Sequence, residues 1–520
     1  MKRRTFVALL FIFALAMPAW ADVKPHGLFT DNCVLQAGKE VPVWGMATPG
    51  EKVTVTVSGK SEASASATAD KDGHWLVRLP SMKAGNDPIT LTIKGKNEVV
   101  VKNVLIGEVW ICSGQSNMEW PLSRSAGAEE HMATSEDSLL RLITIPHSVQ
   151  MTPQYNTGAR WVECAPRTVG NFSAVAYFFG RDLRKALNVP VGLIHTSVGG
   201  TPAEAWTSKD GLNSEPLVQH YLFDLDKAIK NYDPDKAKQA YEEALAKWKE
   251  ASAKAKAEGK KGPNRPNPPQ PPDKSTHAPT GLYNGMIAPL APCAIAGAIW
   301  YQGESNAGQA YEYRTLFPAM IKDWRKHFGQ GDFPFLFVQL APFMKIVNEP
   351  TDSAWAELRD AQLYTTKILP KTGMAVITDV GEENDIHPKK KEPVGARLAL
   401  AARAIAYGDK IEYSGPVFEK ATFEDGKAIL TFSHVGEGLA TRKDELTGFT
   451  ICGEDRKFHN AKSTIIGNDT VEVTCSEVPK PVAVRLGWAN YPVVNLWNKD
   501  GLPASPFRTD DWLGVTAPKK

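Results

Sequence analysis

The sequence predicts an α/β protein in which a buried parallel sheet is flanked by two β-domains. At 520 residues the chain is too long for a single hydrophobic core. Between about residues 105 and 410, short apolar segments alternate with longer amphipathic ones. This alternation is typical of a parallel sheet with helices on both faces. On either side of this region, apolar and polar residues alternate with the two-residue period of half-exposed strands.

The N-terminal segment, residues 1–21, is expected to be a secretory signal peptide. The positively charged start Lys2-Arg3-Arg4 precedes an apolar stretch at 5–17, and Ala19-Trp20-Ala21 has the small residues of a cleavage site. The apolar stretch is too short to span a membrane as a helix. We therefore expect an exported protein, periplasmic or secreted, whose mature chain begins at Asp22 and has no membrane span.

Residues 22–104 predict an immunoglobulin-like β-sandwich. Segments 53–57 and 89–93 alternate apolar and polar side chains, and turn-forming residues such as Thr48-Pro49-Gly50 separate the expected strands. Short strands at this spacing are typical of two packed antiparallel sheets.

Residues 105–410 predict the α/β domain. The expected strands are 104–111, 139–145, 191–196, 294–301, 333–340 and 374–379. The expected helices are 174–187, 311–328, 355–368 and 393–406. An insertion at 208–279 interrupts the pattern. Its first part predicts a helix over 233–256, laid against the domain through Tyr241, Leu245 and Trp248, and its second part is a Pro-rich spacer.

Two-residue alternation returns within 411–520, for example at 428–432 and 470–474, and predicts a C-terminal β-domain. The chain has six cysteines, few for its length in an oxidising compartment. Cys112 is expected to be a buried thiol in the central strand. Cys452 and Cys475 could pair across two strands of one sheet.

Charge and motifs exclude several functional classes. The formal net charge is +2, and loss of Lys2, Arg3 and Arg4 with a signal peptide would leave −1. This balance does not suggest nucleic acid or an anionic membrane as a partner. The sequence has no HExxH motif, no GxxxxGK[ST] motif and no clustered His and Cys residues. We therefore expect no metal and no nucleotide cofactor.

The most informative segment is 111–118, Ile-Cys-Ser-Gly-Gln-Ser-Asn-Met. An apolar strand ends there among small and polar residues, and a helix is expected to begin. Open α/β sheets bind ligands at the carboxyl ends of their strands. Ser116 would therefore be exposed beside backbone N–H groups, as an acyl-transfer nucleophile requires. The alternative is that Ser116 only caps the helix.

Three further polar clusters follow expected strands or lie in loops at the same edge. The first, 196–202, contains Gly200, whose N–H can point into a cleft. The second, 300–306, ends at Asn306, whose amide can donate to an oxyanion. The third, 384–388, contains Asp385 and His387, and a carboxylate at this spacing can orient the imidazole. Taken singly, each cluster is also compatible with an ordinary turn or surface loop.

Together the four clusters supply the groups that ester hydrolysis needs. Ser116 is the predicted nucleophile, His387 the general base and Asp385 the residue that orients the imidazole. The N–H groups of Ser116 and Gly200, with the Asn306 amide, are the predicted oxyanion hole. The G-x-S-x-G motif is absent, which argues against an α/β-hydrolase.

These clusters resemble the sequence blocks of the SGNH/GDSL hydrolase superfamily and, within it, of the sialate O-acetylesterase family. Segment 114–117 resembles the nucleophile block, 199–200 the glycine block, 302–306 the asparagine block and 385–388 the last block. Segments 283–286 and 488–492 also resemble these esterases. The usual acid, three residues before the histidine, would be at Asn384. Asp385 takes that place here, with Glu304 or Asp379 as alternative supporting acids.

The resemblance implies a three-layer α/β/α, flavodoxin-like sheet and metal-independent removal of O-acetyl groups from sialic acid through an acyl-enzyme. Candidate substrate contacts near the blocks are Gln115, Trp120, Gln302 and Glu304. Trp206, Trp300 and Tyr301 could stack on a sugar ring, although core packing is the more common role of such residues.

Two other functions remain open at this point. The same blocks serve acetylxylan and other polysaccharide acetylesterases, and a glycan-binding protein could carry an inert hydrolase domain. If His387 acts as a general base, activity should fall below the pKa of the histidine, ordinarily about 6.5.

Overall fold

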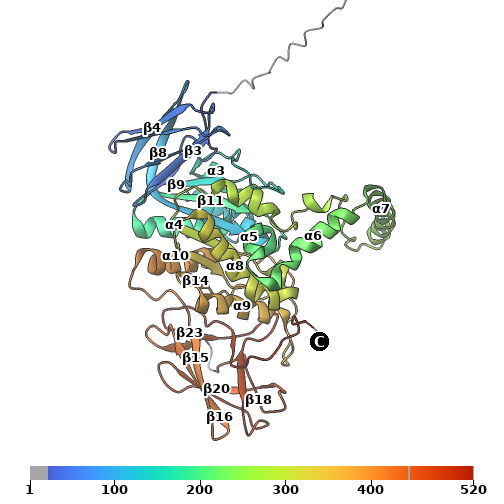
Figure 1. Cartoon of the computed structure of the whole chain (residues 1–520). Helices are drawn as coiled ribbons and strands as arrows, with labels where there is room; N and C mark the ends of the chain where they lie inside the picture. Colours follow the sequence, from blue (N-terminus) through green and yellow to red (C-terminus); the bar gives the residue numbers. More distant parts are fainter. Residues whose placement is uncertain (1–21, 443–444, 519–520) are drawn as a thin grey trace, which may run out of the picture.

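The structure is a computed structural model that describes residues 22–442 and 445–518 (Figure 1). The predicted signal peptide lies outside the described residues. The N-terminal strands are β1 (Lys24–Pro25), β2 (Val34–Gln36), β3 (Val41–Met46), β4 (Lys52–Ser58), β5 (Ala63–Thr68), β6 (His74–Leu79), β7 (Gly85–Lys94) and β8 (Glu98–Gly114). Strands β1, β3 and β6 form one sheet, and β4, β5 and β7 join β8 in another. The predicted alternation is confirmed in β4, where Val53, Val55 and Val57 point into the core.

Strand β8 is common to the N-terminal region and the central sheet. Its first half pairs antiparallel with β7, and residues 105–107 pair parallel with β2. From Glu108 onward it pairs parallel with β11 (Val191–Ser197), and from Trp110 with β12 (Gly297–Tyr301). The boundary expected from the sequence, between residues 104 and 105, therefore falls inside one continuous strand.

The central sheet has the strand order β10-β9-β11-β8-β12-β13-β14. The remaining strands are β9 (Asp137–Thr144), β10 (Val162–Cys164), β13 (Phe335–Val338) and β14 (Thr372–Ala375). All neighbours in this order are parallel except β10 and β9, which are antiparallel. Of the strands in this order, β8 comes first in the sequence, and it lies between β11 and β12. The chain therefore changes direction across the sheet at β8, and the carboxyl end of such a strand is the usual ligand position in open α/β sheets.

Helices cover both faces of this sheet (Figure 1). The large helices are α4 (Ala174–Leu187), α8 (Ala310–Phe328), α9 (Ala354–Ile368) and α10 (Glu392–Tyr407). All four predicted helices are confirmed, with ends that agree to within one residue. Trp110 and Cys112 of β8 pack with α4 and α10, whereas Ile111 packs with the core that includes α8 and α9. The continuous apolar run of β8 is explained by burial on both faces.

Short helices connect these elements. They are α1 (Ser116–Glu119), η1 (Leu122–Arg124), α2 (Ala128–Ala133), α3 (Pro166–Val169), η2 (Ala203–Trp206), α5 (Lys209–Asn213), η3 (Pro216–Val218), η4 (Pro272–Lys274), η5 (Tyr283–Ile287), η6 (Ala288–Leu290) and η7 (Glu304–Gln309). Within the described ranges, no helix combines the length and the apolar composition that crossing a bilayer requires.

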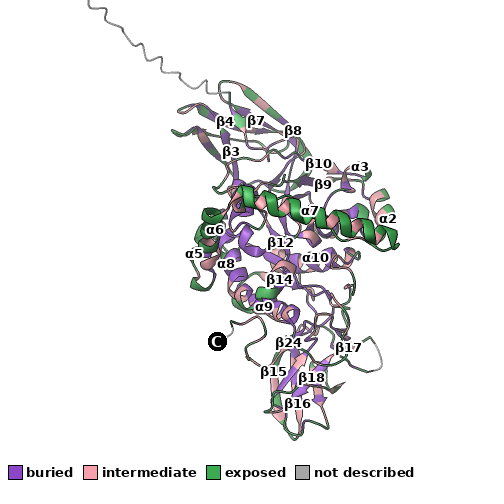
Figure 2. Ribbon diagram, turned by 90° about the vertical axis from the view of Figure 1, so that its right-hand side faces the viewer, coloured by how far each residue is buried: buried purple, intermediate pink, exposed green. Residues whose placement is uncertain are grey.

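The insertion forms α6 (His220–Asn231) and α7 (Pro234–Ala257), which confirms the helix predicted over 233–256. The prediction that this helix lies against the domain is wrong. None of its residues is buried, and it stands outside the sheet and its covering helices (Figures 1 and 2). Trp248 donates its indole N–H to the Pro263 carbonyl at 2.8 Å, so the Pro-rich spacer folds back on its own helix. That contact involves Trp248, one of the three residues through which the sequence predicted docking on the domain.

The C-terminal region is a β-domain. Its strands are β15 (Val417–Glu424), β16 (Lys427–Ser433), β17 (Leu439–Thr441), β18 (Phe449–Cys452), β19 (His459–Asn460), β20 (Lys462–Ile465), β21 (Thr470–Thr474), β22 (Ala483–Leu486), β23 (Leu496–Asn498) and β24 (Phe507–Arg508). They form antiparallel sheets in the orders β15-β16-β21-β20 and β19-β18-β22-β24, with the pair β17-β23. All six cysteines are free: Cys112 is buried, as predicted, and Cys452 and Cys475 are not bonded.

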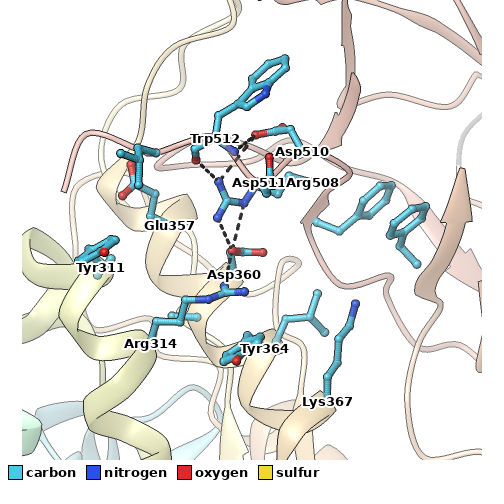
Figure 3. A pocket seen from close by; sticks show the side chains of 17 residues that line it. Tyr311, Arg314, Glu357, Asp360, Tyr364, Lys367, Arg508, Asp510, Asp511 and Trp512 are labelled. Atoms are coloured by element: carbon cyan, nitrogen blue, oxygen red, sulfur yellow. Dashed lines mark hydrogen bonds and ion pairs between the residues drawn. The ribbon is translucent and has the colours of Figure 1, made fainter. Parts of the chain in front are cut away.

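The chain end joins this domain to the helices of the central sheet. Asp360 of α9 lies between Arg314 of α8 and Arg508 of β24, with contacts of 2.9 and 3.1 Å (Figure 3). Glu357 accepts hydrogen bonds from the backbone N–H groups of Val515 and Thr516. The C-terminal segment is thus fixed across α8 and α9 by charged and polar contacts.

Candidate active site

The nucleophile candidate lies at a sharp turn after β8. Gly114 has φ +141°, and a Cβ there would be 2.1 Å from the Tyr301 carbonyl oxygen, so only glycine lets the ends of β8 and β12 approach this closely. Gln115 occupies the N-cap position of α1, and Ser116 is its first helical residue. The Ser116 side chain makes no capping bond, so the alternative that it only caps the helix is wrong. It is free to act at the carboxyl edge of the sheet.

The histidine candidate comes from the loop between β14 and α10. His387 Nε2 lies 2.9 Å from Ser116 Oγ, which is a hydrogen bond between residues 271 positions apart. Contacts on both sides hold this loop: Lys389 donates its N–H to Glu382, and the hydroxyl of Tyr491 in the C-terminal domain donates to the Gly381 carbonyl at 3.0 Å. The segment 488–492, which the sequence marks as similar to esterases, therefore supports the loop that carries the imidazole.

The acid candidates are placed differently from one another. Asp385 Oδ1 accepts the backbone N–H of His387 at 2.9 Å and lies 3.6 Å from His387 Nδ1. The first contact shapes the loop, and the second is longer than a normal hydrogen bond. Asp379 instead forms a two-point ion pair with Arg397, at 2.7 and 2.9 Å. Its alternative role as the supporting acid of the histidine is therefore wrong.

The predicted oxyanion donors fall into two groups. Among the described residues, the N–H groups of Ser116 and Gly200 have no hydrogen-bond acceptor, and the backbone at Gly199 lies against the Ser116 side chain. Asn306 is buried in a network behind this loop. Its oxygen accepts from Ala203 N–H and Gln302, and its nitrogen donates to Glu204 at 2.9 Å.

Gln115 and Gln302 are buried connectors between loops. Gln115 accepts the N–H groups of Gly303 and Ser305 at 3.3 Å, which fixes the nucleophile turn to the loop after β12. Gln302 donates to the Thr201 carbonyl and accepts from the hydroxyl of Tyr313. Because both side chains are enclosed by these contacts, their position favours a role in shaping the site over contact with a substrate.

The aromatic candidates separate into one site residue and three core residues. The Trp120 ring stacks on the His387 imidazole, with centroids 5.2 Å apart and an interplanar angle of 20°. Its other neighbour is the Arg124 guanidinium, 4.1 Å from the ring centroid. Trp206, Trp300 and Tyr301 are fully buried in the core, so the suggestion that they stack on a sugar is wrong.

Sequence reasoning did not single out Lys391 or its partner Asn117 as functional candidates. Lys391 is almost fully buried, and its ammonium group donates to the side-chain oxygen of Asn117, the residue after Ser116. The Asn117 nitrogen donates to Glu304 at 2.5 Å. Nothing in the run Lys389-Lys390-Lys391 distinguishes the buried lysine from its exposed neighbours, because its partners come from distant segments.

The surroundings of His387 favour its neutral form. Burial lowers the pKa of His387 below its ordinary value, and the positive charges of Lys391 and Arg124 act in the same direction, while Asp385 opposes them. Burial lowers the pKa of Lys391 to about 7 and raises that of Glu304. A neutral imidazole beside a serine hydroxyl is the form that can accept a proton.

In the described part of the chain, no group of three or more His, Cys, Asp or Glu side chains is placed to hold a metal ion. The chemistry that the site offers comes from a hydroxyl, an imidazole and backbone donors. This set can perform acyl transfer.

Comparison with known proteins agrees with this chemistry. Residues 274–403 match the family described as carbohydrate esterase, sialic acid-specific acetylesterase. A sialate O-acetylesterase of Mus musculus is 30% identical over 96% of this chain and 97% of its own length. The Homo sapiens sialate O-acetylesterase is 28% identical over 89% and 88%. A crystal structure of a carbohydrate acetylesterase from Xanthomonas citri is 38% identical, covers 94% of this chain and 100% of its own, and superposes with a TM-score of 0.79.

Proposed function

Because the chain belongs to the sialate O-acetylesterase family and is a carboxylic ester hydrolase, we propose that it removes O-acetyl groups from sialic acid with Ser116 as nucleophile. The observation that carries this proposal is the 2.9 Å contact between Ser116 Oγ and His387 Nε2. The alternative of a glycan-binding protein with an inert hydrolase domain gives no reason for this contact.

The proposed reaction has two halves. His387 Nε2 accepts the Ser116 proton while Oγ attacks the acetyl carbonyl, and the imidazolium then protonates the departing sugar oxygen. A water molecule then gives a proton to the same nitrogen and attacks the acetyl carbonyl, and the imidazolium returns that proton to Ser116 Oγ as acetate leaves. The unsatisfied N–H groups of Ser116 and Gly200 are suited to the oxyanion of both tetrahedral intermediates. Asn306 would contribute its second amide hydrogen, because the first is used by Glu204.

We assign Asp385 an orienting role. Its contact with the His387 backbone fixes the loop, and a small closure of the 3.6 Å gap to Nδ1 would bring the carboxylate into a hydrogen bond with the imidazolium. Trp120 holds the opposite face of the same ring. Loop geometry, stacking and charge would then share the task of orienting the base.

The pH dependence should follow the depressed pKa of His387. The base must be neutral, and a lowered pKa keeps it neutral to lower pH than an ordinary histidine. We therefore expect kcat/KM to stay high below pH about 6.5 and to fall only as the pH passes through the depressed value. A pH–rate profile of kcat/KM for acetate release checks this, and an acid-limb midpoint above that pH would contradict it.

Arg124 is the group that favours an acidic sugar. Its guanidinium lies on Trp120 beside the imidazole, is exposed, and makes no ion pair or hydrogen bond within the described ranges. Sialic acid carries a carboxylate, and a planar guanidinium binds carboxylates through two parallel hydrogen bonds. A substrate carboxylate is the partner that this cation lacks in the protein itself.

Arg124→Gln should raise KM for free O-acetylated sialic acid about tenfold, because a hydrogen bond to a charged group contributes roughly 1.5–3 kcal/mol. KM for acetylated xylo-oligosaccharides, which are neutral, should remain within about twofold. The measurement is acetate release from both substrates at about pH 8, where His387 is neutral with or without Arg124.

Arg167→Gln, which removes an exposed arginine in α3, is the control for charge alone and should leave both substrates unaffected. An equal or faster rate of the native enzyme on acetylated xylan would favour the second candidate, a polysaccharide acetylesterase.

We further propose the SGNH layout for the central domain and export for the protein. The covered parallel sheet and the position of Ser116 after its first central strand support the layout. The charged, apolar and small-residue segments within 1–21 support export. Protein sequencing of the mature N-terminus would test the second proposal, for which Asp22 is the expected first residue.

A further inference from the structure

Lys391 stands out because a lysine is rarely this deeply buried. It precedes the first residue of α10 and is 1% exposed. Its ammonium donates to the side-chain oxygen of Asn117 and lies 5.4 and 5.8 Å from the ring centroids of Tyr301 and Trp120. Two aromatic faces and one amide oxygen replace the water that the charge would otherwise hold. Burial of this kind costs free energy, so a plain packing role would be served better by an apolar side chain.

Asn117 converts this contact into a junction between three segments. Its oxygen accepts from Lys391, and its nitrogen donates to Glu304 at 2.5 Å and to the Ile386 carbonyl at 3.0 Å. An ammonium can only donate and a carboxylate can only accept, so the two charges fix which way the amide points. Asn117 follows Ser116, and Ile386 precedes His387. The junction therefore lies one residue away from both reacting side chains.

We propose that Lys391 is a positioning residue for the esterase reaction. Through Asn117 it holds the Ser116 turn against the His387 loop, and its positive charge keeps the imidazole neutral. This role rests on the proposed chemistry of Ser116 and His387. A misplacement of about 1 Å between reacting groups can cost roughly 100-fold in rate, so a rigid link between the two segments has a direct kinetic value.

Charged groups from several segments act on Lys391 and His387. Lys391 faces Glu304 of η7, and Asp385 and Glu382 of the histidine loop, all of which stabilise its charge. His387 faces Lys391 and Arg124, which lower its pKa, and Asp385, which raises it. Because the pKa of Lys391 is about 7, the lysine is charged over the acidic range in which His387 titrates. Loss of that charge should raise the pKa of His387.

Two substitutions separate the hydrogen bond from the charge. Lys391→Met removes both, whereas Lys391→Gln removes the charge and retains a donor that is one atom shorter. With 4-nitrophenyl acetate as the probe, we expect Lys391→Met to lower kcat at least tenfold, with KM within about twofold. Lys391→Gln should lose less of kcat. Both should shift the acid limb of kcat/KM to higher pH. Lys390→Met, which changes the exposed neighbour, is the matched control and should change neither quantity.

The pH shift distinguishes positioning at the site from a merely structural role, because loss of stability alone lowers the amount of active enzyme and leaves the limb in place. Melting temperatures identify a variant that fails to fold. If Lys391→Met fails to fold, the test is the acid limb of kcat/KM in the Lys391→Gln enzyme. Unchanged kcat and an unchanged limb in the folded variants would overturn the inference. Ser116→Ala, assayed in parallel, tests the proposed function separately: an inactive Ser116→Ala enzyme beside fully active Lys391 variants would overturn the positioning role alone.

Discussion

Ser116→Ala is expected to reduce acetate release at least 1,000-fold, a lower bound beside the roughly million-fold loss of kcat that removal of a serine nucleophile causes in a hydrolase with a catalytic triad. In the proposed mechanism the Ser116 hydroxyl forms the acyl-enzyme, and without it His387 has no nucleophile to deprotonate. The Ser116 side chain is small and makes no other hydrogen bond to the residues that the structure describes, so the fold should not change. The check is kcat for O-acetylated sialic acid, together with the melting temperature of the variant.

The matched control is Ser138→Ala, which removes an exposed hydroxyl from β9 and should leave the rate unchanged. A Ser116→Ala enzyme that retains even a tenth of the native rate would remove this residue from the mechanism. The acetyl-enzyme gives a second check. Rapid mixing with 4-nitrophenyl acetate should produce a burst of nitrophenol from the native protein and none from the variant.

His387→Gln is expected to lower kcat between about 100-fold and 10,000-fold, the range that general acid–base catalysis supplies. Glutamine can keep the hydrogen bond to Ser116 but cannot carry the proton from the hydroxyl to the departing sugar. The acid limb of the profile should vanish with the imidazole. The measurement is kcat/KM across the acidic range for the native and substituted enzymes.

Residues that act as a unit are not additive, so the double variant Ser116→Ala/His387→Gln should be no slower than Ser116→Ala alone. His277→Gln, an exposed histidine after the Pro-rich spacer, is the control for the substitution itself. A residual acid limb in the His387→Gln enzyme would show that another group titrates as the base.

Strong local signals explain how much of the fold the sequence predicts. The helix at 174–187 is predicted to the residue because its apolar face recurs every three to four positions and Ser173 caps its start. Most strand positions are right, but several predicted strands are too long: 333–340 is predicted where β13 is Phe335–Val338. The strand predicted at 374–379 is displaced, because β14 is Thr372–Ala375. Apolar character continues past the last ladder bond, and sequence alone does not mark where pairing stops.

Residues that depend on distant partners escape prediction. Trp206 and Trp300 lie near the predicted blocks along the chain, yet each packs in the core against the other, 6.0 Å between centroids. In the sequence, Lys391 cannot be distinguished from the two exposed lysines before it. Its burial follows from tertiary contacts with Asn117, which in turn bonds to Glu304. Helix α7 has an apolar face, but Trp248 on that face bonds to Pro263, which lies in a segment with no hydrophobic pattern of its own. Each of these outcomes is decided by tertiary contacts.

The Ser116 and His387 pair is the opposite case. Their segments have local features that point to the same edge of the sheet, an apolar strand that ends in small polar residues and a loop after the last strand. The rule that parallel strands present their carboxyl ends together does the rest. The acid is harder to infer because Asp379, Asp385 and Glu304 are all near in sequence or space. Only the coordinates show that Arg397 takes the first and Asn117 the last.

Because β8 is shared, the N-terminal β-region supports the strand that carries the nucleophile. A chain that began at residue 105 would lack β2 and β7 and would leave Leu105 and Ile106 as an unpaired apolar end, eleven and ten residues upstream of the nucleophile. Heat should consequently melt this region and the central sheet in one step. Recombination between relatives would have to exchange the N-terminal β-region and the central sheet together. The two regions are therefore distinct in structure but form one unit of inheritance.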